Sequence, residues 1–421
     1  MRNMKDSGIS WIGRIPEEWK LIKYKYFCDV FAGGTPDTNN PFYYDGNIPW
    51  IQSGKVQNCI IYGASRYITE LGVKGSSTKF IPENTAVLAM TGGTCGNVGF
   101  TSENVYGNQS IMAFVNKNKE KIYDKYIYWT LYIQKDGILI NQNGSAQAGI
   151  NVDSGKNLYM PCPMYETQIK ISKFLDEKIL EIENIINKTK ETILEYKKNK
   201  ISLIDKIVVK GLSNNRNLID SKILWLGEIP QEWKIKKGKY VLTLLSRNIN
   251  PSDEIITCFR DGEVTLRSNR RLDGFTISEK EIGYQGIEPG DLIVHGMDGF
   301  AGAIGISDSR GKATPVLNVL DSKENKRYLM YFLRRLAYNG IFLALSTGIR
   351  VRTCDTNWNK LKELDFIIPS REEQEEIANY LDEKCNDIDK LIASKEKIIE
   401  ELEKYKKSVI YEYVTGKKEV K

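Results

Sequence analysis

The sequence predicts an α+β chain in which two modules of mixed strands and helices are joined by two long helices. A long internal repeat carries this prediction, because residues 163–210 return as residues 369–416 without a gap. Gln168 matches Gln374, which sets the shift at 206 residues (374 − 168). A shorter repeat opens each half of the chain. A chain whose parts recur in the same order is a tandem duplication of one unit.

Each copy of the long repeat predicts one helix of about 45 residues, roughly 70 Å long. Apolar residues recur at alternating steps of three and four, which is the heptad pattern of a helix that packs along a partner helix. The apolar seam consists of Ile182, Ile186, Ile193, Tyr196 and Leu203 in the first copy, and Ile388, Ile392, Ile399, Leu402 and Val409 in the second. Lys200 and Lys406 occupy one equivalent seam position, where a polar group fixes register. An ordinary helical hairpin is the alternative, but the long sequence between the copies favours two separated modules.

The opening repeat is W-x-G-x-I-P-x-E-W-K, which begins at Trp11 and again at Trp225, a shift of 214 (225 − 11). Its Gly and Pro indicate a turn, and its tryptophans are expected to pack that turn against neighbouring structure. We therefore divide the chain into four parts, each predicted from these repeats. They are a first module (1–162), a first long helix (163–212), a second module (213–368) and a second long helix (369–421).

Composition limits the class of protein. The 421 residues exceed one core, and the net charge of +6 suits a polyanionic partner without requiring one. Seven scattered cysteines without a C-x-x-C motif indicate reduced thiols, and a single histidine, His295, offers no zinc constellation. No apolar run reaches the roughly 18 residues of a membrane span. We expect a cytoplasmic protein without a membrane association.

The modules share a predicted fold but differ in most of their sequence. Short strands are expected at residues 48–51, 87–90 and 292–295, and helices at 124–132 and 326–337. Glycine-rich turns at 92–99 and 299–305 correspond at the shift of 206 (299 − 93) and are predicted to be hairpin turns. They match no nucleotide-binding motif, and one histidine excludes most acid–base arrangements. We predict no catalytic residue, no metal site and no cofactor in this chain.

Polar and basic residues in the modules are the candidates for a nucleic-acid interface. Lys and Arg neutralise phosphates, Arg pairs with guanine, and Asn or Gln pairs with adenine in the major groove. The first module offers Lys55, Ser76, Ser77, Lys79, Gln109, Gln147 and Asn151, and the second offers Arg247, Arg260, Arg267, Arg270, Arg271, Arg350 and Arg352. Charged residues on a surface are usually only solvated, so no single candidate carries the prediction. Taken together, the candidates predict two related modules that read different short sequences.

The duplicated opening, the G-G-T-P loop at residues 33–36, the helix start P-x-x-x-x-Q-x-x-I-x-x-[FY]-L-D-E-K and the closing residues 413–417 resemble the specificity subunit of Type I restriction-modification systems. One departure is Thr167, which precedes Gln168 where the family usually has an acidic residue. The resemblance covers essentially the whole chain. It implies two target-recognition domains joined by antiparallel coiled-coil helices in a pseudo-twofold arrangement.

The resemblance also implies a non-catalytic DNA-recognition subunit. Double-stranded DNA, methylation subunits and a restriction subunit are the implied partners. S-adenosylmethionine is expected on the methylation subunit, and ATP and Mg on the restriction subunit. Each module is expected to read one half of a bipartite site, and the helix pair is expected to set the spacer and to dock the methylation subunits. From its arginines, the second module is expected to prefer a half-site that contains guanine, and the first module a more A·T-weighted one. A self-contained restriction and methylation enzyme and a coiled-coil scaffold without nucleic acid remain alternatives.

Overall fold

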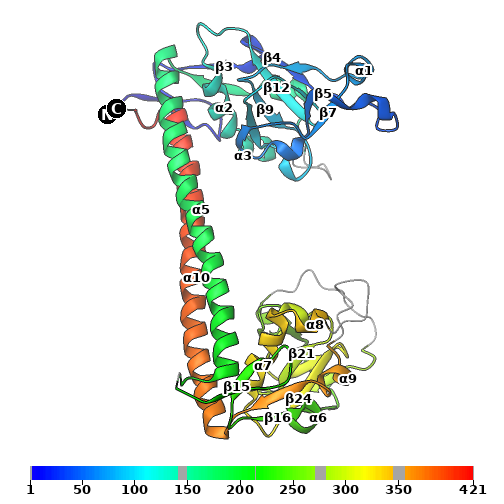
Figure 1. Ribbon diagram of the computed structural model, residues 1–421. Helices are drawn as coiled ribbons and strands as arrows, with labels where there is room; N and C mark the ends of the chain where they lie inside the picture. Colours follow the sequence, from blue (N-terminus) through cyan, green and yellow to red (C-terminus); the bar gives the residue numbers. More distant parts are fainter. Residues whose placement is uncertain (1, 141–148, 214, 271–280, 345–355, 421) are drawn as a thin grey trace. The chain divides into compact units, whose positions relative to one another are not determined.

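The computed structural model describes residues 2–140, 149–213, 215–270, 281–344 and 356–420 (Figure 1). The chain folds into two compact units. Unit 1 combines residues 1–189 with residues 397–421, and unit 2 consists of residues 190–396. Each unit therefore contains one module and one part of each long helix.

The two long helices are α5 (Tyr165–Lys210) and α10 (Arg371–Val414), as the repeat predicts. In unit 1, Ile182 and Ile186 of α5 belong to one hydrophobic core with Val409 near the carboxyl end of α10. In unit 2, Ile204 of α5 shares a core with Leu381 near the amino end of α10. The early part of each helix thus packs against the late part of the other, so the pair is antiparallel.

Two ion pairs fix the register of this helix pair. Lys406 Nζ lies 2.5 Å from Glu183 Oε1 in unit 1, and Lys200 Nζ lies 2.6 Å from Asp389 Oδ2 in unit 2. The paired residue numbers add to the same total in both units (183 + 406 = 589 and 200 + 389 = 589). At the repeat shift of 206, Lys200 corresponds to Lys406 and Glu183 to Asp389. The seam lysines therefore make equivalent contacts, as expected of a pseudo-twofold pair.

The seam residues themselves are buried to different degrees. Five of them are buried: Ile182, Ile186, Ile193, Ile392 and Val409. The remaining seam residues are partly buried: Tyr196, Leu203, Ile388, Ile399 and Leu402.

The module of unit 1 is built on two sheets. One has the strand order β4-β12-β9-β10-β6 and the other β7-β5-β11-β8. Short two-stranded ladders pair β1 with β2 and β13 with β3. The strands are β1 (Met4–Asp6), β2 (Arg14–Pro16), β3 (Lys20–Lys23), β4 (Cys28–Ala32), β5 (Tyr44–Ile51), β6 (Cys59–Ile61), β7 (Arg66–Ile68), β8 (Phe80–Ile81), β9 (Ala86–Ala89), β10 (Val98–Thr101), β11 (Val105–Gly107), β12 (Ile111–Asn116) and β13 (Tyr159–Cys162). The strand predicted at residues 48–51 is the end of β5, which begins at Tyr44.

Helix α2 (Asp124–Tyr132) connects this module to the long helices, and its bounds are those predicted. Tyr126 and Trp129 of α2 are buried in the same core as Leu175 of α5. Tyr126 Oη also donates to the carbonyl oxygen of Val414 in α10, at 3.3 Å. The other helical segments are η1 (Tyr24–Tyr26), η2 (Pro41–Tyr43), η3 (Ser53–Lys55), α1 (Glu70–Lys74), η4 (Gly92–Thr94), α3 (Lys135–Ile140) and α4 (Val152–Lys156).

The module of unit 2 has a sheet in the order β17-β24-β21-β22, with two-stranded ladders β14-β15, β16-β25, β18-β19 and β20-β23. Its strands are β14 (Leu218–Asp220), β15 (Glu228–Pro230), β16 (Lys234–Lys237), β17 (Thr243–Leu244), β18 (Ile256–Cys258), β19 (Val264–Leu266), β20 (Gln285–Ile287), β21 (Leu292–His295), β22 (Ile304–Ile306), β23 (Gly311–Ala313), β24 (Leu317–Asp321) and β25 (Asp365–Ile368). Its helical segments are α6 (Gly238–Val241), η5 (Arg267–Asn269), η6 (Gly299–Ala301), α7 (Lys326–Tyr338), α8 (Ile341–Ala344) and α9 (Trp358–Leu361).

Both predicted glycine-rich turns are hairpin turns. β9 pairs with β10 and β21 pairs with β22, each antiparallel. Helix α7 corresponds to α2, since Tyr328 Oη donates to the carbonyl oxygen of Val208 in α5 at 3.3 Å. The predicted similarity of the two modules is thus present in strand order, in the turn and in the covering helix.

In each unit, the opening repeat packs against one end of α10. In unit 1, Trp19 is buried, and a Cβ on Gly416 would lie 2.6 Å from Pro16. In unit 2, the indole of Trp233 donates to Glu373 Oε2 of α10, at 2.9 Å. The tryptophans therefore pack the turn, as predicted. Across the described residues, no helix has both the length and the apolar character needed to cross a bilayer.

Candidate nucleic-acid interface

In unit 1, loops that are far apart in the sequence meet at one end of the main sheet. Gly33 and Gly34 follow β4, and the amide of Gly34 donates to the carbonyl oxygen of Gly107, at 2.8 Å. A Cβ on Gly33 would lie 2.0 Å from that same oxygen, and one on Gly34 would lie 2.4 Å from the amide nitrogen of Thr78. Only glycine permits this approach.

Two further loops join the same end. Thr91, which follows β9, donates from its hydroxyl to Ser110 Oγ at 3.0 Å, and its backbone forms a β-bridge with Gly149. The first loop edge is defined here as residues 33–36, 76–79, 91–94, 107–110 and 149–151. It combines five segments of the module, so its side chains form one surface.

Most of the first-module candidates lie on the first loop edge. Gln109 Oε1 accepts from the Thr35 hydroxyl, Ser76 Oγ donates to the Gly72 carbonyl at 2.7 Å, and the Lys79 amine lies 5.2 Å from the centre of the Phe31 ring. Ser77 packs against Gly34, and Asn151 caps α4 by accepting from the Ser154 amide at 2.8 Å.

Two first-module candidates lie elsewhere. Lys55 lies on η3, where its amine donates to the Tyr62 carbonyl at 3.0 Å. Gln147 is outside the described residues. The loop edge thus brings five of the seven candidates together and leaves their role in base contact a prediction.

In unit 2 the corresponding loops also converge. The hydroxyl of Thr356 donates to the His295 carbonyl at 2.8 Å, and the amide of Gly296 donates to the Val316 carbonyl at 2.8 Å. A Cβ on Gly302 would lie 3.1 Å from the Arg260 carbonyl oxygen. The second loop edge is defined here as residues 259–263, 296–302, 314–316 and 356.

His295 supports the second loop edge from the end of β21. Its Nδ1 accepts from the amides of Met297 and Asp298, at 3.2 and 3.0 Å. Burial lowers the pKa of His295, which the Asp298 carboxylate partly offsets. The neutral ring is the form that can accept both hydrogen bonds. These contacts give the histidine a structural role in this loop.

The described arginines of the second module contact acidic or polar neighbours. Arg260 pairs with Asp298 at 2.9 Å, and Arg270 pairs with Glu263 at 3.0 Å and lies 4.3 Å from the centre of the Phe259 ring. Arg267 Nε donates to Thr257 Oγ1 at 3.2 Å, and burial lowers its pKa.

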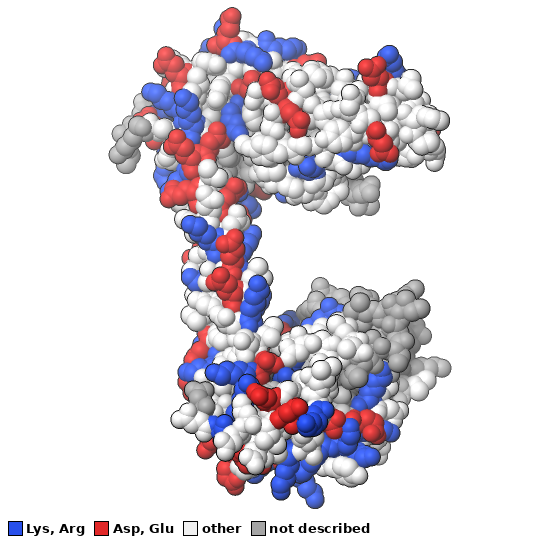
Figure 2. All heavy atoms as spheres, in the orientation of Figure 1, with Lys and Arg blue, Asp and Glu red and all other residues white. Residues whose placement is uncertain are grey.

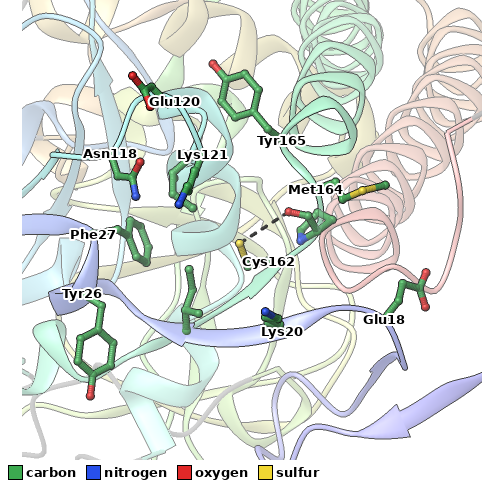
Figure 3. A pocket seen from close by; sticks show the side chains of 13 residues that line it. Glu18, Lys20, Tyr26, Phe27, Asn118, Glu120, Lys121, Cys162, Met164 and Tyr165 are labelled. Atoms are coloured by element: carbon green, nitrogen blue, oxygen red, sulfur yellow. Dashed lines mark hydrogen bonds between the residues drawn. The ribbon is translucent and has the colours of Figure 1, made fainter.

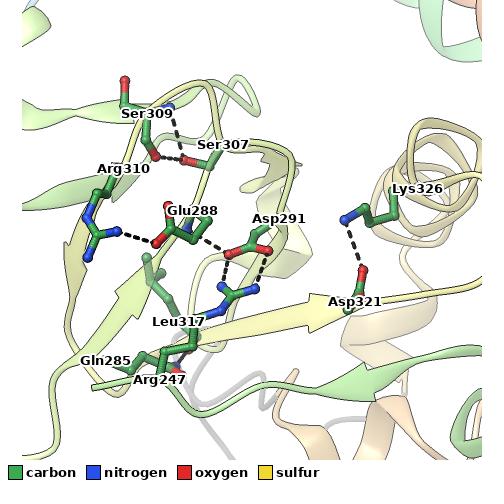
Figure 4. A network of polar contacts seen from close by, with 10 residues as sticks. All are labelled: Arg247, Gln285, Glu288, Asp291, Ser307, Ser309, Arg310, Leu317, Asp321 and Lys326. Atoms are coloured by element: carbon green, nitrogen blue, oxygen red, sulfur yellow. Dashed lines mark hydrogen bonds and ion pairs between the residues drawn. The ribbon is translucent and has the colours of Figure 1, made fainter. Parts of the chain in front are cut away.

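Arg247 belongs to a partly exposed polar network. It pairs with Asp291, whose side chain is buried, and Asp291 in turn accepts from the amide of Glu288 at 2.8 Å (Figure 4). Arg310 pairs with Glu288 at 2.6 Å. These contacts give Arg247 a role in the fold of the module. The remaining arginine candidates, Arg271, Arg350 and Arg352, lie outside the described residues.

Charge is distributed differently over the two units. Figure 2 shows Lys and Arg interspersed with Asp and Glu along the helices and over unit 2, whereas the visible face of the first module is largely uncharged. A guanidinium has five donors, so an arginine that pairs with one carboxylate keeps donors for a base edge. Arg260, which is exposed on the second loop edge and pairs with Asp298, therefore keeps donors for a base edge.

The L-D-E-K motif shows how each module is held on its helix. Leu175 is buried, and Asp176 accepts from the indole of Trp129 at 3.2 Å and lies 3.6 Å from Lys125 Nζ. Burial lowers the pKa of Lys125 and raises that of Asp176. In unit 2, Asp382 accepts from the Tyr331 hydroxyl at 2.8 Å. Sequence reasoning found the motif but not this docking role, which only the contact between helices reveals.

The described residues contain no cluster of three or more His, Cys, Asp or Glu side chains that could hold a metal ion. Burial raises the pKa of Cys258 to about 12, so this thiol stays protonated.

The chain thus has two modules of one fold, and each module carries a convergent set of polar loops and packs on the duplicated helix pair. The family described as Type I restriction modification DNA specificity domain matches residues 16–195 and again residues 232–404. The chain belongs to this family and is a specificity subunit with two DNA target-recognition domains.

Relatives and solved structures agree with this assignment. The MjaVIII specificity subunit of Methanocaldococcus jannaschii is 23% identical over 97% of this chain and 95% of its own length. The EcoR124I/EcoR124II specificity subunit of Escherichia coli is 29% identical over 38% of this chain and 40% of its own.

A chain from a solved structure of complex assembly in a type I R-M system has a TM-score of 0.68 at 13% identity, and covers 95% of this chain and 98% of its own. The HsdS subunit of Thermoanaerobacter tengcongensis has a TM-score of 0.50 at 13% identity, with 96% and 98% covered. These likenesses establish the fold, and the alternative of a self-contained enzyme or a scaffold gains no support.

Proposed function

We propose that each loop edge reads one half of a bipartite DNA site and that the helix pair sets the gap between the two halves. The observation that carries this proposal is the contrast within the duplication. The opening repeat, the helices and the hairpin turn recur, whereas the loops that form the two edges differ in sequence. A shared scaffold with different loops suits the reading of two different sequences by one mode of binding.

The base preferences are expected to differ between the modules. The second module would favour a half-site that contains guanine, because Arg260 can present a fork of donors to guanine O6 and N7. The first module would favour a half-site richer in A·T pairs, through amide and hydroxyl side chains such as Gln109. Lysines would hold the phosphates without regard to sequence.

Catalysis is assigned to partner subunits. The chain would bind methylation subunits and a restriction subunit and would contribute no catalytic residue itself. S-adenosylmethionine would be held by the methylation subunit, and ATP and Mg by the restriction subunit.

A module exchange tests the proposal. Residues 213–368 are replaced by the corresponding module of another specificity subunit, and the methylated sites of the host genome are sequenced. We expect one half of the site to change while the other half and the spacer stay the same. A change in both halves would contradict independent reading, and methylation by the purified chain alone would revive the self-contained enzyme.

A further inference from the structure

The opening repeat is longer than its tryptophan motif. It continues to Tyr26 in the first module and to Tyr240 in the second, at the same shift of 214 (240 − 26). Within this continuation, a lysine-tyrosine pair recurs as Lys25-Tyr26 and Lys239-Tyr240. After these tyrosines the two sequences diverge.

The two pairs are alike in their exposure and in the distance between lysine and ring. Tyr26 and Tyr240 are each 74% exposed. The lysine amine lies 5.4 Å from the centre of the neighbouring ring in both modules. Lys20 and Lys234, which end the tryptophan motif, are also exposed in both. We define the first platform as Lys20, Lys25 and Tyr26, and the second platform as Lys234, Lys239 and Tyr240.

A single exposed tyrosine is ordinary on a protein surface, so the repetition of the pair, and not its exposure, is the feature that requires an explanation. Folding does not require the exposed ring, because the buried neighbours of each pair, Tyr24 and Phe27 in the first module, anchor the segment. Duplicated modules that diverged in their loops have nevertheless kept the same exposed side chains. A surface that is the same in both modules suits a partner that is the same in both.

The strand register places the first platform at the opposite end of the sheet from the first loop edge. Tyr26 precedes β4, whose first residue, Cys28, pairs with Asn116, whereas its last residue, Ala32, pairs with Met112. The loop edge begins directly after Ala32. The five residues of β4 separate the two surfaces by about 15 Å.

The second platform has the same position. Val241, which follows Tyr240, accepts at its carbonyl from the hydroxyl of Ser322, directly beyond the end of β24. The second loop edge lies at the other end of β24, where residues 314–316 precede Leu317. DNA held by the loop edges would therefore contact the far end of each sheet, and the platforms would remain free for a protein.

A hollow of about 490 Å³ adjoins the first platform (Figure 3). Tyr26, Lys20, Lys121, Met164 and Tyr165 are among its lining residues, and Met164 is 80% exposed. Lysines beside exposed apolar surface match a partner that presents a carboxylate next to an apolar side chain. Glu18 and Glu120 also line the hollow, so its charge is mixed.

We propose that the two platforms are equivalent docking sites for one protein partner, bound once by each module through an acidic and apolar surface. On the proposed function above, this partner is the methylation subunit, so the inference rests on that function. The platforms would give two copies of one subunit the same position on two modules that read different DNA.

Paired variants test the inference. The first carries Lys25→Glu with Tyr26→Ala, and the second carries Lys239→Glu with Tyr240→Ala. Native mass spectrometry then counts the methylation subunits of the same restriction-modification system on each chain. We expect two on the wild type, one on either paired variant and none on the combined variant. Two copies retained on either paired variant would overturn the proposal.

Lys74→Glu with Tyr62→Ala is the matched control. Tyr62 is 69% exposed, and Lys74 is exposed at the end of α1, both outside the repeated segment. The control makes the same charge change and ring truncation in the first module, and it should bind two subunits. A control that also binds only one would overturn the assignment to the platform.

A DNA measurement separates the proposals. Each chain alone is titrated with a duplex that carries the site found by methylation sequencing. The platform variants should bind it within twofold of the wild type. A large loss of DNA affinity with two subunits retained would identify the platforms as DNA contacts and overturn the inference. Absence of any methylation subunit on the wild type would instead contradict the proposed function.

Discussion

At the scale of the residue, His295 makes the folding stability of the chain depend on pH. Its neutral ring accepts two backbone amides, and burial lowers its pKa below the ordinary value of 6.5. In the unfolded chain the ring takes up a proton near pH 6.5. The unfolded state therefore binds more protons over the interval below that pH, and folding stability falls as the pH falls. Above about pH 6.5 the ring is neutral in both the folded and the unfolded chain, so the contribution of His295 to folding stability no longer changes with pH.

We predict that His295→Gln removes part of this pH dependence. The unfolding free energy of wild type should fall between pH 7.5 and pH 5.5 more steeply than that of the variant, by at most about 1.4 kcal/mol per pH unit. Urea unfolding at a series of pH values measures both slopes. Equal slopes would show that His295 titrates alike in the folded and unfolded chain.

At the scale of the element, the seam ion pairs decide the register of α5 and α10. We predict that Glu183→Lys, which places a lysine against the buried Lys406, lowers the unfolding free energy by about 1–3 kcal/mol. Adding Lys406→Glu restores an opposite pair and should recover most of the loss. Urea unfolding of the four proteins completes the cycle. A double variant as unstable as the sum of the single variants would refute the contact.

A buried glutamine in the first turn of each long helix is the second stabilising feature at this scale. Gln168 is fully buried, accepts from the Tyr123 amide at 3.0 Å and donates to the carbonyls of Lys121 and Pro163, both at 3.0 Å. Gln374 makes the equivalent contacts with Asn325 and Pro369. The side chain thus ties the first turn of each long helix to its module.

We predict that Gln168→Leu costs about 2–4 kcal/mol of stability, since it leaves buried backbone groups without partners. Lys173→Leu, at an exposed position of the same helix, is the control for introducing leucine and should change stability by less than about 0.5 kcal/mol. Thermal and urea unfolding measure both. Similar losses in the two variants would contradict this role of Gln168.

At the scale of the whole molecule, the proposed role of the helix pair can be tested by its length. Inserting seven residues after residue 189 and seven after residue 399 keeps the seam pattern and the pairing of both helices. Each insertion adds about 10 Å of helix. We predict a DNA spacer longer by up to about three base pairs, given 3.4 Å per base pair. Sequencing of methylated sites measures the spacer.

An insertion of four residues in one helix alone is the contrasting variant. It shifts one side of the seam against the other, so we expect a longer spacer or the loss of DNA binding. An unaltered site in either variant would contradict the proposal that the helices set the spacer.

The sequence alone determined the long helices, the duplication and the packing of the tryptophans. These features depend on local periodicity and on repeats, which can be read along the chain. The boundaries of α2 followed from the same signals, and α5 and α10 lie within the two copies of the long repeat. The sequence also identified Lys200 and Lys406 as equivalent positions, but it did not identify the residues with which they pair.

Only the tertiary structure decided which residues meet. An apolar seam alone is compatible with either helix direction, and the antiparallel register appears in the contacts of Lys406 with Glu183 and of Lys200 with Asp389. The loop edges join segments that are many residues apart, and their glycines permit a backbone approach that no local pattern reveals. Arg247 was an interface candidate by residue type, yet its pairing with buried Asp291 depends on a long-range contact. Such contacts arise from packing between distant segments, so no reading of the chain in order contains them.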